Sequence, residues 1–178
     1  MWEAVGGASN RWLRQNGIST VSFACGYRHK KIRKYFRDGR NFGVAIRYLV
    51  EREPLGTGGA IKQALRSARS NPVVVVNGDI LTNLDLNGVI RWHESRSFLA
   101  TILGVPLKCP YGVLEEDGDR VCGFREKPVF PNVWVNAGVY VMERDAVEYL
   151  QEKGDVERQG FPELADKGML GLYRSDAW

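Results

Sequence analysis

Val-Val-Val-Val-Asn-Gly-Asp, residues 73–79, is the stretch that decides the expected fold. Four β-branched residues follow Asn71-Pro72 and end at Asn77-Gly78, which predicts a strand buried on both faces, as in a parallel sheet. Asp79 then stands at the carboxyl end of that strand, where ligands bind in open α/β sheets. A carboxylate there can hold Mg²⁺. The alternative is that Asp79 caps a helix or finishes a turn.

Up to Val105, expected strands alternate with expected helices. The other strands are expected at Ile18–Ala24, Val44–Val50 and Ala100–Val105, and the helices at Arg11–Asn16, His29–Phe36, Ala60–Ala68 and Asp85–Ser95. Residues 1–10 are expected to be irregular. The alternation predicts an α/β fold with a mostly parallel central sheet and helices on both faces.

Beyond Val105 the pattern changes to strands without long helices between them. Strands are expected at Tyr111–Glu115, Val121–Glu126, Trp134–Met142 and Leu170–Tyr173, and helices at Asp145–Glu152 and Val156–Lys167. The turn residues Asp117-Gly118-Asp119 predict a hairpin between the first two strands. This half is expected to form a smaller antiparallel or mixed part packed beside the parallel sheet.

Length and charge limit the function classes. A chain of 178 residues suits one domain, residues 1–178, with a substantial core. The net charge of +4 fits an anionic ligand such as a nucleotide, and also an ordinary basic surface. The basic face of His29–Phe36 could touch phosphates, but a solvated helix face is the favoured interpretation. Without a long Lys/Arg run or an aromatic-and-basic motif, a nucleic-acid partner is not expected.

Cysteine usage and hydropathy bear on location. Cys25, Cys109 and Cys122 lie far apart and form no C-x-x-C pair, so we expect reduced thiols and no metal knuckle. The N-terminus lacks a signal-peptide pattern, and no apolar run approaches the roughly 18 residues of a membrane span. A cytoplasmic protein with no membrane partner is expected. The sequence leaves a homo-oligomer open.

Glu53–Ala60 is a glycine-rich loop that opens a helix. Glycines allow a ligand to approach the backbone closely, and a helix N-terminus offers N–H groups and a positive dipole end. The loop could cradle a nucleobase, ribose or phosphate, yet it matches neither G-x-G-x-x-G nor the P-loop pattern. The alternative is a plain strand-to-helix connection with Thr57 as the N-cap.

Two further strand ends carry polar residues. In Phe124–Pro128, the Glu126 carboxylate could accept hydrogen bonds from sugar hydroxyls and Lys127 could hold a phosphate; the alternative is a solvated pair. In Val135–Tyr140, Asn136 is followed by small residues that would let a ligand lie against the backbone. The alternative is an edge strand with a glycine bulge. No Ser-His-Asp or Cys-His grouping can be argued.

Five motifs in order resemble one known family. They are PLGTGGA at 54–60, VVNGD at 75–79, YGVL at 111–114, FREKP at 124–128 and VNAGVYV at 135–141. Together they are similar to the sugar-1-phosphate nucleotidylyltransferases, and most similar to the mannose-1-phosphate guanylyltransferase type, which includes heptose-phosphate guanylyltransferases. The resemblance runs from Trp12 to Trp178. It implies a Rossmann-like nucleotide-diphospho-sugar transferase fold.

The resemblance also implies a reaction and a set of site residues. A nucleoside triphosphate and a sugar 1-phosphate would give a nucleotide-sugar, of the GDP-mannose type, and pyrophosphate, with Mg²⁺ as cofactor. Asp79 and Lys127 would be catalytic, and Asp79 would be the metal ligand. The nucleotide would contact Leu55, Gly56, Thr57, Gly58 and Asp79. The sugar phosphate would contact Gly112, Glu126, Lys127 and Asn136.

The chain departs from the family pattern near both ends. Val5-Gly6-Gly7 runs directly into the Trp12 helix, so the family's N-terminal glycine-rich loop and Pro-Lys-Pro segment are expected to be missing. The second metal-binding aspartate of the family has no match, because Asp176 is not at its position. The family also begins with a strand that would lie next to the Val73 strand and is expected to be missing here. Its loss would leave the Val73 strand with an unpaired edge, so a fragment with reduced stability and little turnover is expected.

Two functional classes therefore stay open. The first is an enzyme of nucleotide-sugar synthesis that is complete only in a longer parent or with a partner chain. The second is a non-catalytic module that binds nucleotide-sugar or a partner subunit. An unrelated flavodoxin-like binding protein is a third option. The sequence does not choose the base or the sugar.

Overall fold

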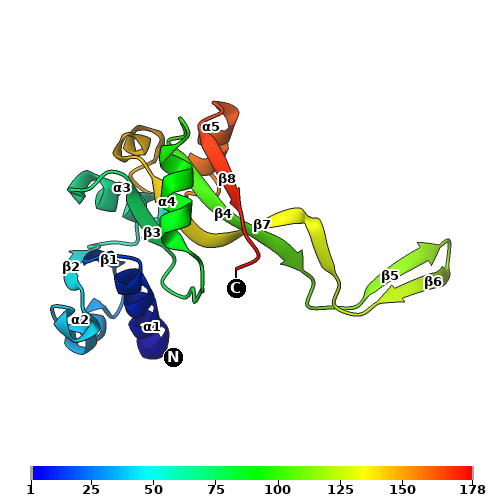
Figure 1. Cartoon of the computed structure of the whole chain (residues 1–178), viewed down its shortest axis with the longest axis horizontal. Helices are drawn as coiled ribbons and strands as arrows, with labels where there is room; N and C mark the ends of the chain where they lie inside the picture. The colour runs from blue at the N-terminus through cyan, green and yellow to red at the C-terminus, as the bar shows by residue number, and fades with distance from the viewer. Residues whose placement is uncertain (1, 178) are drawn as a thin grey trace.

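The computed structural model describes residues 2–177, with side chains from residue 6 onward. Its elements are α1 (Trp2–Gln15), β1 (Thr20–Cys25), α2 (His29–Phe36), η1 (Arg40–Phe42), β2 (Ala45–Val50), α3 (Gly56–Ser67), β3 (Val73–Val76), α4 (Leu86–Glu94), β4 (Ala100–Lys108), β5 (Val113–Asp117), β6 (Arg120–Arg125), β7 (Val129–Met142), η2 (Arg144–Tyr149), α5 (Gly160–Asp166) and β8 (Leu170–Arg174). Figure 1 shows a body of helices and strands from which the β5–β6 hairpin projects. No helix in the described part is long and apolar enough to cross a bilayer.

The largest sheet is mixed, with the strand order β3-β7-β4-β8. β7 runs antiparallel to both β3 and β4, and β4 runs parallel to β8. The prediction of a mostly parallel central sheet is therefore wrong. A hairpin rather than a crossover helix joins β4 to β7, so the chain returns antiparallel to β4. A separate parallel pair is formed by β1 and β2.

The valine run forms β3, and its side chains enter two core clusters. Val73 and Val75 pack against the cluster that contains Leu65 and Leu164, whereas Val74 and Val76 pack against the cluster of Leu84, Leu103 and Val141. The alternation of side chains along a strand places these clusters on opposite faces of the sheet. β3 is the last strand of its sheet, as expected for a strand with one unpaired edge.

The N-terminal helix is longer than predicted. The sequence predicted an irregular start and a helix from Arg11, whereas α1 already begins at Trp2. Glycine weakens a helix, but here it permits close packing: a Cβ on Gly6 would lie 2.8 Å from the ring of Phe36, and one on Gly7 would lie 3.3 Å from the ring of Phe42. Tertiary packing against these rings therefore outweighs the low helix propensity.

The last predicted helices are shorter than expected. The expected helix at 145–152 is the 3-10 helix η2, and the expected helix at 156–167 begins only at Gly160. The residues between them, 151–159, form a loop that packs against the N-terminus of α3. By contrast α4 agrees with the prediction, because the Asp85 side chain caps it by accepting a hydrogen bond from the Gly88 N–H at 3.1 Å.

Candidate functional site

Asp79 lies in the turn that follows β3, and it is exposed. The turn is fixed from within, because the Ile80 N–H donates to the Asn77 carbonyl at 3.1 Å and the Asn77 N–H donates to the Gly138 carbonyl at 2.9 Å. Within the described side chains, no ion pair or hydrogen bond engages the Asp79 carboxylate. The carboxylate is therefore available to a ligand.

The side chains near Asp79 could supply Mg²⁺ with only part of its ligands. The described residues contain no group of three or more His, Cys, Asp or Glu side chains that could hold a metal. Mg²⁺ commonly takes one or two carboxylates and completes its shell with water and substrate phosphates. Asp79 could be such a carboxylate, with water and substrate phosphates as the remaining ligands. The described residues do not form a site in which the protein alone surrounds the metal.

The glycine-rich loop packs against another part of the backbone. Helix α3 begins at Gly56, whose φ is 73°, with Leu55 as the N-cap residue. A Cβ at Gly56 would lie 2.5 Å from the Gly154 carbonyl oxygen, and one at Gly59 would lie 2.4 Å from the Glu152 carbonyl oxygen. These glycines thus permit close approach of residues 152–156. Their contact with a nucleotide stays a prediction.

The alternative interpretation of this loop placed Thr57 at the N-cap of the helix, which is wrong, because Leu55 is the N-cap residue. The Thr57 hydroxyl donates to the Glu157 carboxylate at 2.7 Å and accepts from the Val156 N–H at 2.9 Å. The backbone reinforces the contact, since the Gly58 N–H donates to the Gly154 carbonyl at 2.8 Å. The start of α3 is therefore held by a loop about 100 residues away in sequence.

Asn136 is held in one orientation beside the turn of Asp79. Its amide Nδ2 donates to the Tyr140 hydroxyl at 2.9 Å, and its Oδ1 accepts from the Gly138 N–H at 2.9 Å. Gly138 has a φ of 72°, and a Cβ there would lie 3.0 Å from the Asn77 amide nitrogen. Asn136 and the Asp79 turn are therefore neighbours, as a shared ligand site requires.

Tyr140 is the residue that sequence reasoning missed. It is 1% exposed, and its ring packs edge-on against Phe161 with the centroids 4.9 Å apart. Burial raises the pKa of its hydroxyl, while hydrogen bonds with Asn136 and Asn77 oppose the rise and the Glu157 charge adds to it. The hydroxyl is therefore neutral at physiological pH. Its spacing from Asn136 was not a usable signal, because the register of β7 against β4 shifts between these two residues and Gly138 between them has a φ of 72°, so regular alternation does not hold there.

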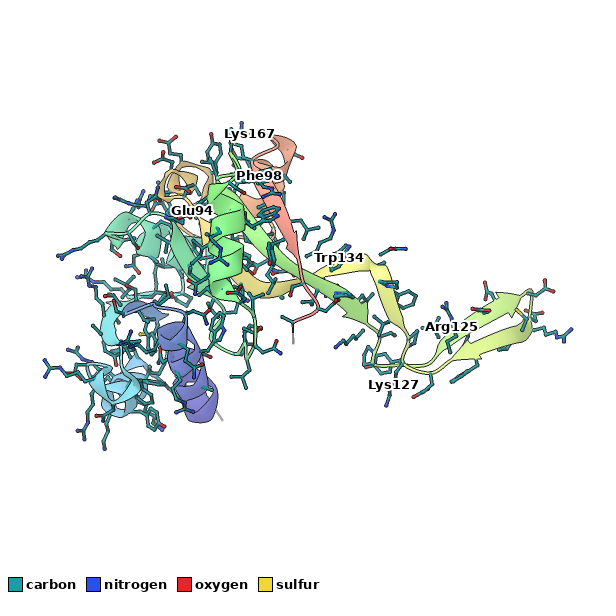
Figure 2. All side chains as sticks on the ribbon, in the orientation of Figure 1. Glu94, Phe98, Arg125, Lys127, Trp134 and Lys167 are labelled. Atoms are coloured by element: carbon teal, nitrogen blue, oxygen red, sulfur yellow. The ribbon has the colours of Figure 1, made fainter. Side chains whose placement is uncertain are left out.

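Glu126, Lys127 and Gly112 lie together at the base of the projecting hairpin. Lys127 Nζ lies 3.8 Å from Glu126 Oε1, both side chains are mostly exposed, and a Cβ on Gly112 would lie 3.2 Å from Glu126 Oε2. Figures 1 and 2 show that Lys127 is carried out beyond β7, away from β3 and α3. The structure thus brings Asn136 to the Asp79 turn, but it does not bring Glu126 and Lys127 there.

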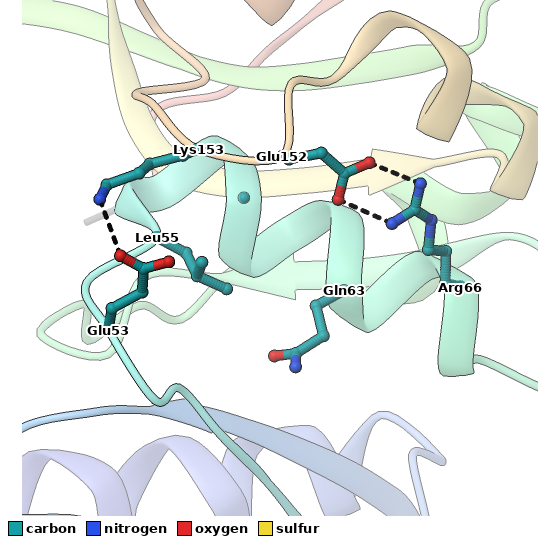
Figure 3. A pocket seen from close by; sticks show the side chains of 7 residues that line it. Glu53, Leu55, Gln63, Arg66, Glu152 and Lys153 are labelled. Carbon is teal, nitrogen blue, oxygen red and sulfur yellow. Dashed lines mark hydrogen bonds and ion pairs between the residues drawn. The ribbon is translucent and has the colours of Figure 1, made fainter.

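A cavity of about 310 Å³ lies beside the start of α3 (Figure 3). It is lined by Glu53, Leu55, Gly59, Gln63, Arg66, Glu152 and Lys153. Its charges are mutually paired: Arg66 donates to both oxygens of Glu152 at 2.7 and 2.8 Å, and Lys153 lies 3.1 Å from Glu53. Hydrogen bonds, first from Arg66 and then from Lys62, lower the pKa of Glu152 to about 2.

His93 of α4 is buried in the core. It is 1% exposed, its Nδ1 lies 2.7 Å from the Thr101 hydroxyl, and its Nε2 lies 3.1 Å from Glu143 Oε1. A histidine, a carboxylate and a hydroxyl are thus aligned. Thr101 is fully buried, so this hydroxyl has no access to a substrate.

Known proteins resemble this chain in sequence and in fold. A family model described as nucleotidyl transferase matches residues 9–172. The chain is 37% identical over 172 residues to a D-glycero-alpha-D-manno-heptose 1-phosphate guanylyltransferase of Aneurinibacillus thermoaerophilus, covering 94% of this chain and 74% of that one. It is 34% identical to a mannose-1-phosphate guanylyltransferase of Mycobacterium tuberculosis, covering 88% of this chain but only 45% of that protein. HddC from Yersinia pseudotuberculosis, solved in complex with GMP-PN, superposes with a TM-score of 0.75 at 25% identity, covering 98% of this chain and 77% of that one.

Proposed function

Because this chain belongs to the nucleotidyl transferase family, we propose that residues 1–178 form one enzymatic domain that transfers a nucleotidyl group to a sugar 1-phosphate. The products are a nucleotide-sugar and pyrophosphate. Similarity to guanylyltransferases favours a guanosine nucleotide and a mannose or heptose phosphate. The observation that carries the proposal is the exposed, unpaired Asp79 carboxylate beside the fixed amide of Asn136.

The reaction is a displacement at the α-phosphorus of the triphosphate. A phosphate oxygen of the sugar 1-phosphate forms the new P–O bond, and the bond to the bridging oxygen breaks, so that pyrophosphate leaves with the electron pair. Asp79 would hold Mg²⁺, which supplies neutralisation of the phosphate charge. Asn136 would orient the sugar through its amide, and Lys127 would offset the charge of the sugar phosphate.

The nucleotide is proposed to lie along the start of α3. Leu55, Gly56, Thr57 and Gly58 stand at this helix N-terminus, whose dipole favours an anion. The loop of Gly154 packs on one side of these glycines, so the nucleotide would take the opposite side. The cytoplasm is the proposed location, in keeping with the free thiols of Cys25, Cys109 and Cys122.

The position of the hairpin favours a second candidate function. Glu126, Lys127 and Gly112 lie away from β3 (Figures 1 and 2), so the arrangement shown could bind a nucleotide without completing the sugar-phosphate site. A module that binds nucleotide or nucleotide-sugar without turnover is therefore the alternative. Transfer would require the hairpin base to move toward Asp79.

Pyrophosphate release tests the two candidates. The assay combines each of five nucleoside triphosphates with mannose, heptose or glucose 1-phosphate in the presence of Mg²⁺, for the wild type and Asp79→Asn. Asp166→Asn, an exposed carboxylate on α5, is the matched control. Release that Asp79→Asn abolishes and Asp166→Asn leaves intact supports transfer and identifies the base. Nucleotide binding by calorimetry without release would support the binding module, and neither activity would reject both.

A further inference from the structure

The β5–β6 hairpin, called here the arm, exposes an apolar and acidic surface. Its register pairs Leu114 with Phe124 and Glu116 with Val121. Leu114 and Glu116 share a face of β5, and residues that pair directly across two strands point to the same side. A register shift between Glu115 and Glu116 adds one residue on β6, so Phe124 and Val121 lie on that same side although they are three residues apart. These four residues form one side of the arm, called here the arm face. Leu114 is 57% exposed and Phe124 is 64% exposed. The opposite side carries the ion pair between Glu115 and Arg125 at 3.1 Å and is therefore electrically balanced.

Among the described residues, the arm face meets its own chain only at the base of the arm, where a Cβ on Gly112 would lie 2.5 Å from the Phe124 ring. β5 and β6 pack against each other and make no comparable contact with any other described element. Two-stranded hairpins are marginally stable alone, and contiguous exposed apolar residues usually mark an interaction surface. The arm face thus indicates a partner that covers Leu114 and Phe124 and offers positive charge to Glu116.

Helix α2 presents the complementary surface. Ile32 and Phe36 turn inward, while Lys30, Lys31 and Lys34 face solvent. The ring of Tyr35 packs against Phe36 and Phe42 and is 44% exposed beside these lysines. No carboxylate of the described side chains lies within ion-pair distance of these three lysines. We call Lys30, Lys31, Lys34 and Tyr35 the basic helix face.

The neighbouring Tyr27 extends the basic helix face with a second ring. It is 86% exposed, and the Arg28 guanidinium lies 5.0 Å from its ring centroid. Rings and ammonium groups on this helix thus match the apolar side chains and the carboxylate of the arm face in character and in sign.

We infer that the arm of one molecule docks on the basic helix face of a second copy of this chain. The arm and α2 lie at opposite ends of the molecule (Figure 1), so one chain cannot join its own two surfaces. Two such contacts related by a two-fold axis close a dimer, in which each copy gives one arm and receives one. The contact covers Leu114 and Phe124 and places Glu116 near the lysines.

Charge reversal on both surfaces gives a direct test by sedimentation velocity at roughly 100 μM, where a micromolar interface is occupied. The wild type is expected to sediment as a dimer in about 0.05 M NaCl and to dissociate substantially in about 0.5 M, because exposed ion pairs are screened. On the arm, the variant joins Glu116→Lys with Asp119→Lys in the exposed turn between β5 and β6. This variant, or Lys30→Glu with Lys34→Glu on the helix, should give monomers. All four changes in one chain should restore the dimer.

Controls separate this contact from general effects of charge and folding. Arg69→Glu with Lys167→Glu changes the net charge by as much as the helix variant does, at exposed positions on other elements, and should stay dimeric. Leu114→Ser with Phe124→Ser should be monomeric with an unchanged far-ultraviolet circular dichroism spectrum.

Three results would overturn the inference. They are a wild-type monomer in low salt, association that survives charge reversal on one surface, and failure of the four-fold variant to associate. A monomer that binds a single-stranded oligonucleotide through Lys30 and Lys34 would assign the basic helix face to nucleic acid instead. None of these readouts depends on nucleotidyl transfer.

Discussion

The amide of Asn136 donates a 2.9 Å hydrogen bond to the hydroxyl of Tyr140, and both residues lie on β7 with Gly138 between them. The amide oxygen of Asn136 is engaged as well, by the Gly138 N–H. Both ends of this side chain are thus fixed before any ligand binds. Preorganisation of this kind lowers the entropic cost of orienting a bound sugar.

Tyr140→Phe tests this relationship. The change removes the hydrogen bond to Asn136 while keeping the ring packed against Phe161. We expect a loss of about 0.5–1.5 kcal/mol in the free energy of unfolding, and a KM for the sugar 1-phosphate raised by about three- to tenfold. Urea unfolding and steady-state kinetics measure the two effects.

Tyr149→Phe serves as the control for Tyr140→Phe, because Tyr149 lies on η2, away from Asn136. The interpretation of Tyr140 as a positioning residue would be rejected by an unchanged KM together with a loss of stability. That combination would leave Tyr140 as a core residue alone.

Gly59→Ala should destabilise the start of α3. The added Cβ would lie 2.4 Å from the Glu152 carbonyl oxygen, which is backbone and cannot rotate away. Overpacking of this kind costs about 1–3 kcal/mol in the free energy of unfolding. Gly78→Ala is the matched control, because no atom lies within 4 Å of the Cβ position there. Equal unfolding midpoints for the two variants would contradict the packing role assigned to Gly59.

The ion pairs of Glu152 predict a pH dependence of stability. Hydrogen bonds from Arg66 and Lys62 lower the pKa of this carboxyl from 4.5 to about 2 in the folded state. A depressed folded-state pKa gives a stabilising contribution that is present above about pH 4.5 and is lost as the pH falls toward 2. We expect Glu152→Gln to flatten the decline of the melting temperature over that interval.

The control for Glu152→Gln is Glu148→Gln, an exposed glutamate on η2 that lies outside these ion pairs. It should keep the wild-type decline. If both variants showed the same acid profile as the wild type, the ion pairs of Glu152 would make no measurable contribution. Such an outcome is common for exposed pairs.

His93→Phe should lower stability without changing nucleotide binding. The substitution removes the partner of the Thr101 hydroxyl and one of the partners of Glu143, and it leaves a buried hydroxyl unsatisfied. We expect a loss of about 2–3 kcal/mol in the free energy of unfolding. His29→Phe should cost less, because the partly exposed His29 ring makes one contact, to the Gly26 carbonyl. A change in nucleotide affinity for His93→Phe alone would instead connect His93 with the site.

The sequence by itself determined the elements whose signals are local. The valine run of Val73–Val76 forms a strand whose partly buried side chains pack against core clusters on both faces of the sheet, because alternate side chains on a strand must point to opposite sides. Asp85 marked the start of α4, because its carboxylate reaches an N–H only three residues away. The order of five short motifs was enough to identify the family.

The tertiary structure alone decided how distant segments meet. β7 lies antiparallel between β3 and β4, which no local pattern specifies. The glycines of α3 accommodate Gly154 and Glu152 of a remote loop, and Tyr140 orients Asn136 only because β7 brings both to one face. The sequence placed Lys127 and Asp79 in one site, whereas the arm separates them (Figures 1 and 2). Such contacts depend on the register and packing of segments that are far apart in the chain. The periodicity of residues along the sequence predicts only which side chains share a face of one strand or one helix, so it does not predict these contacts.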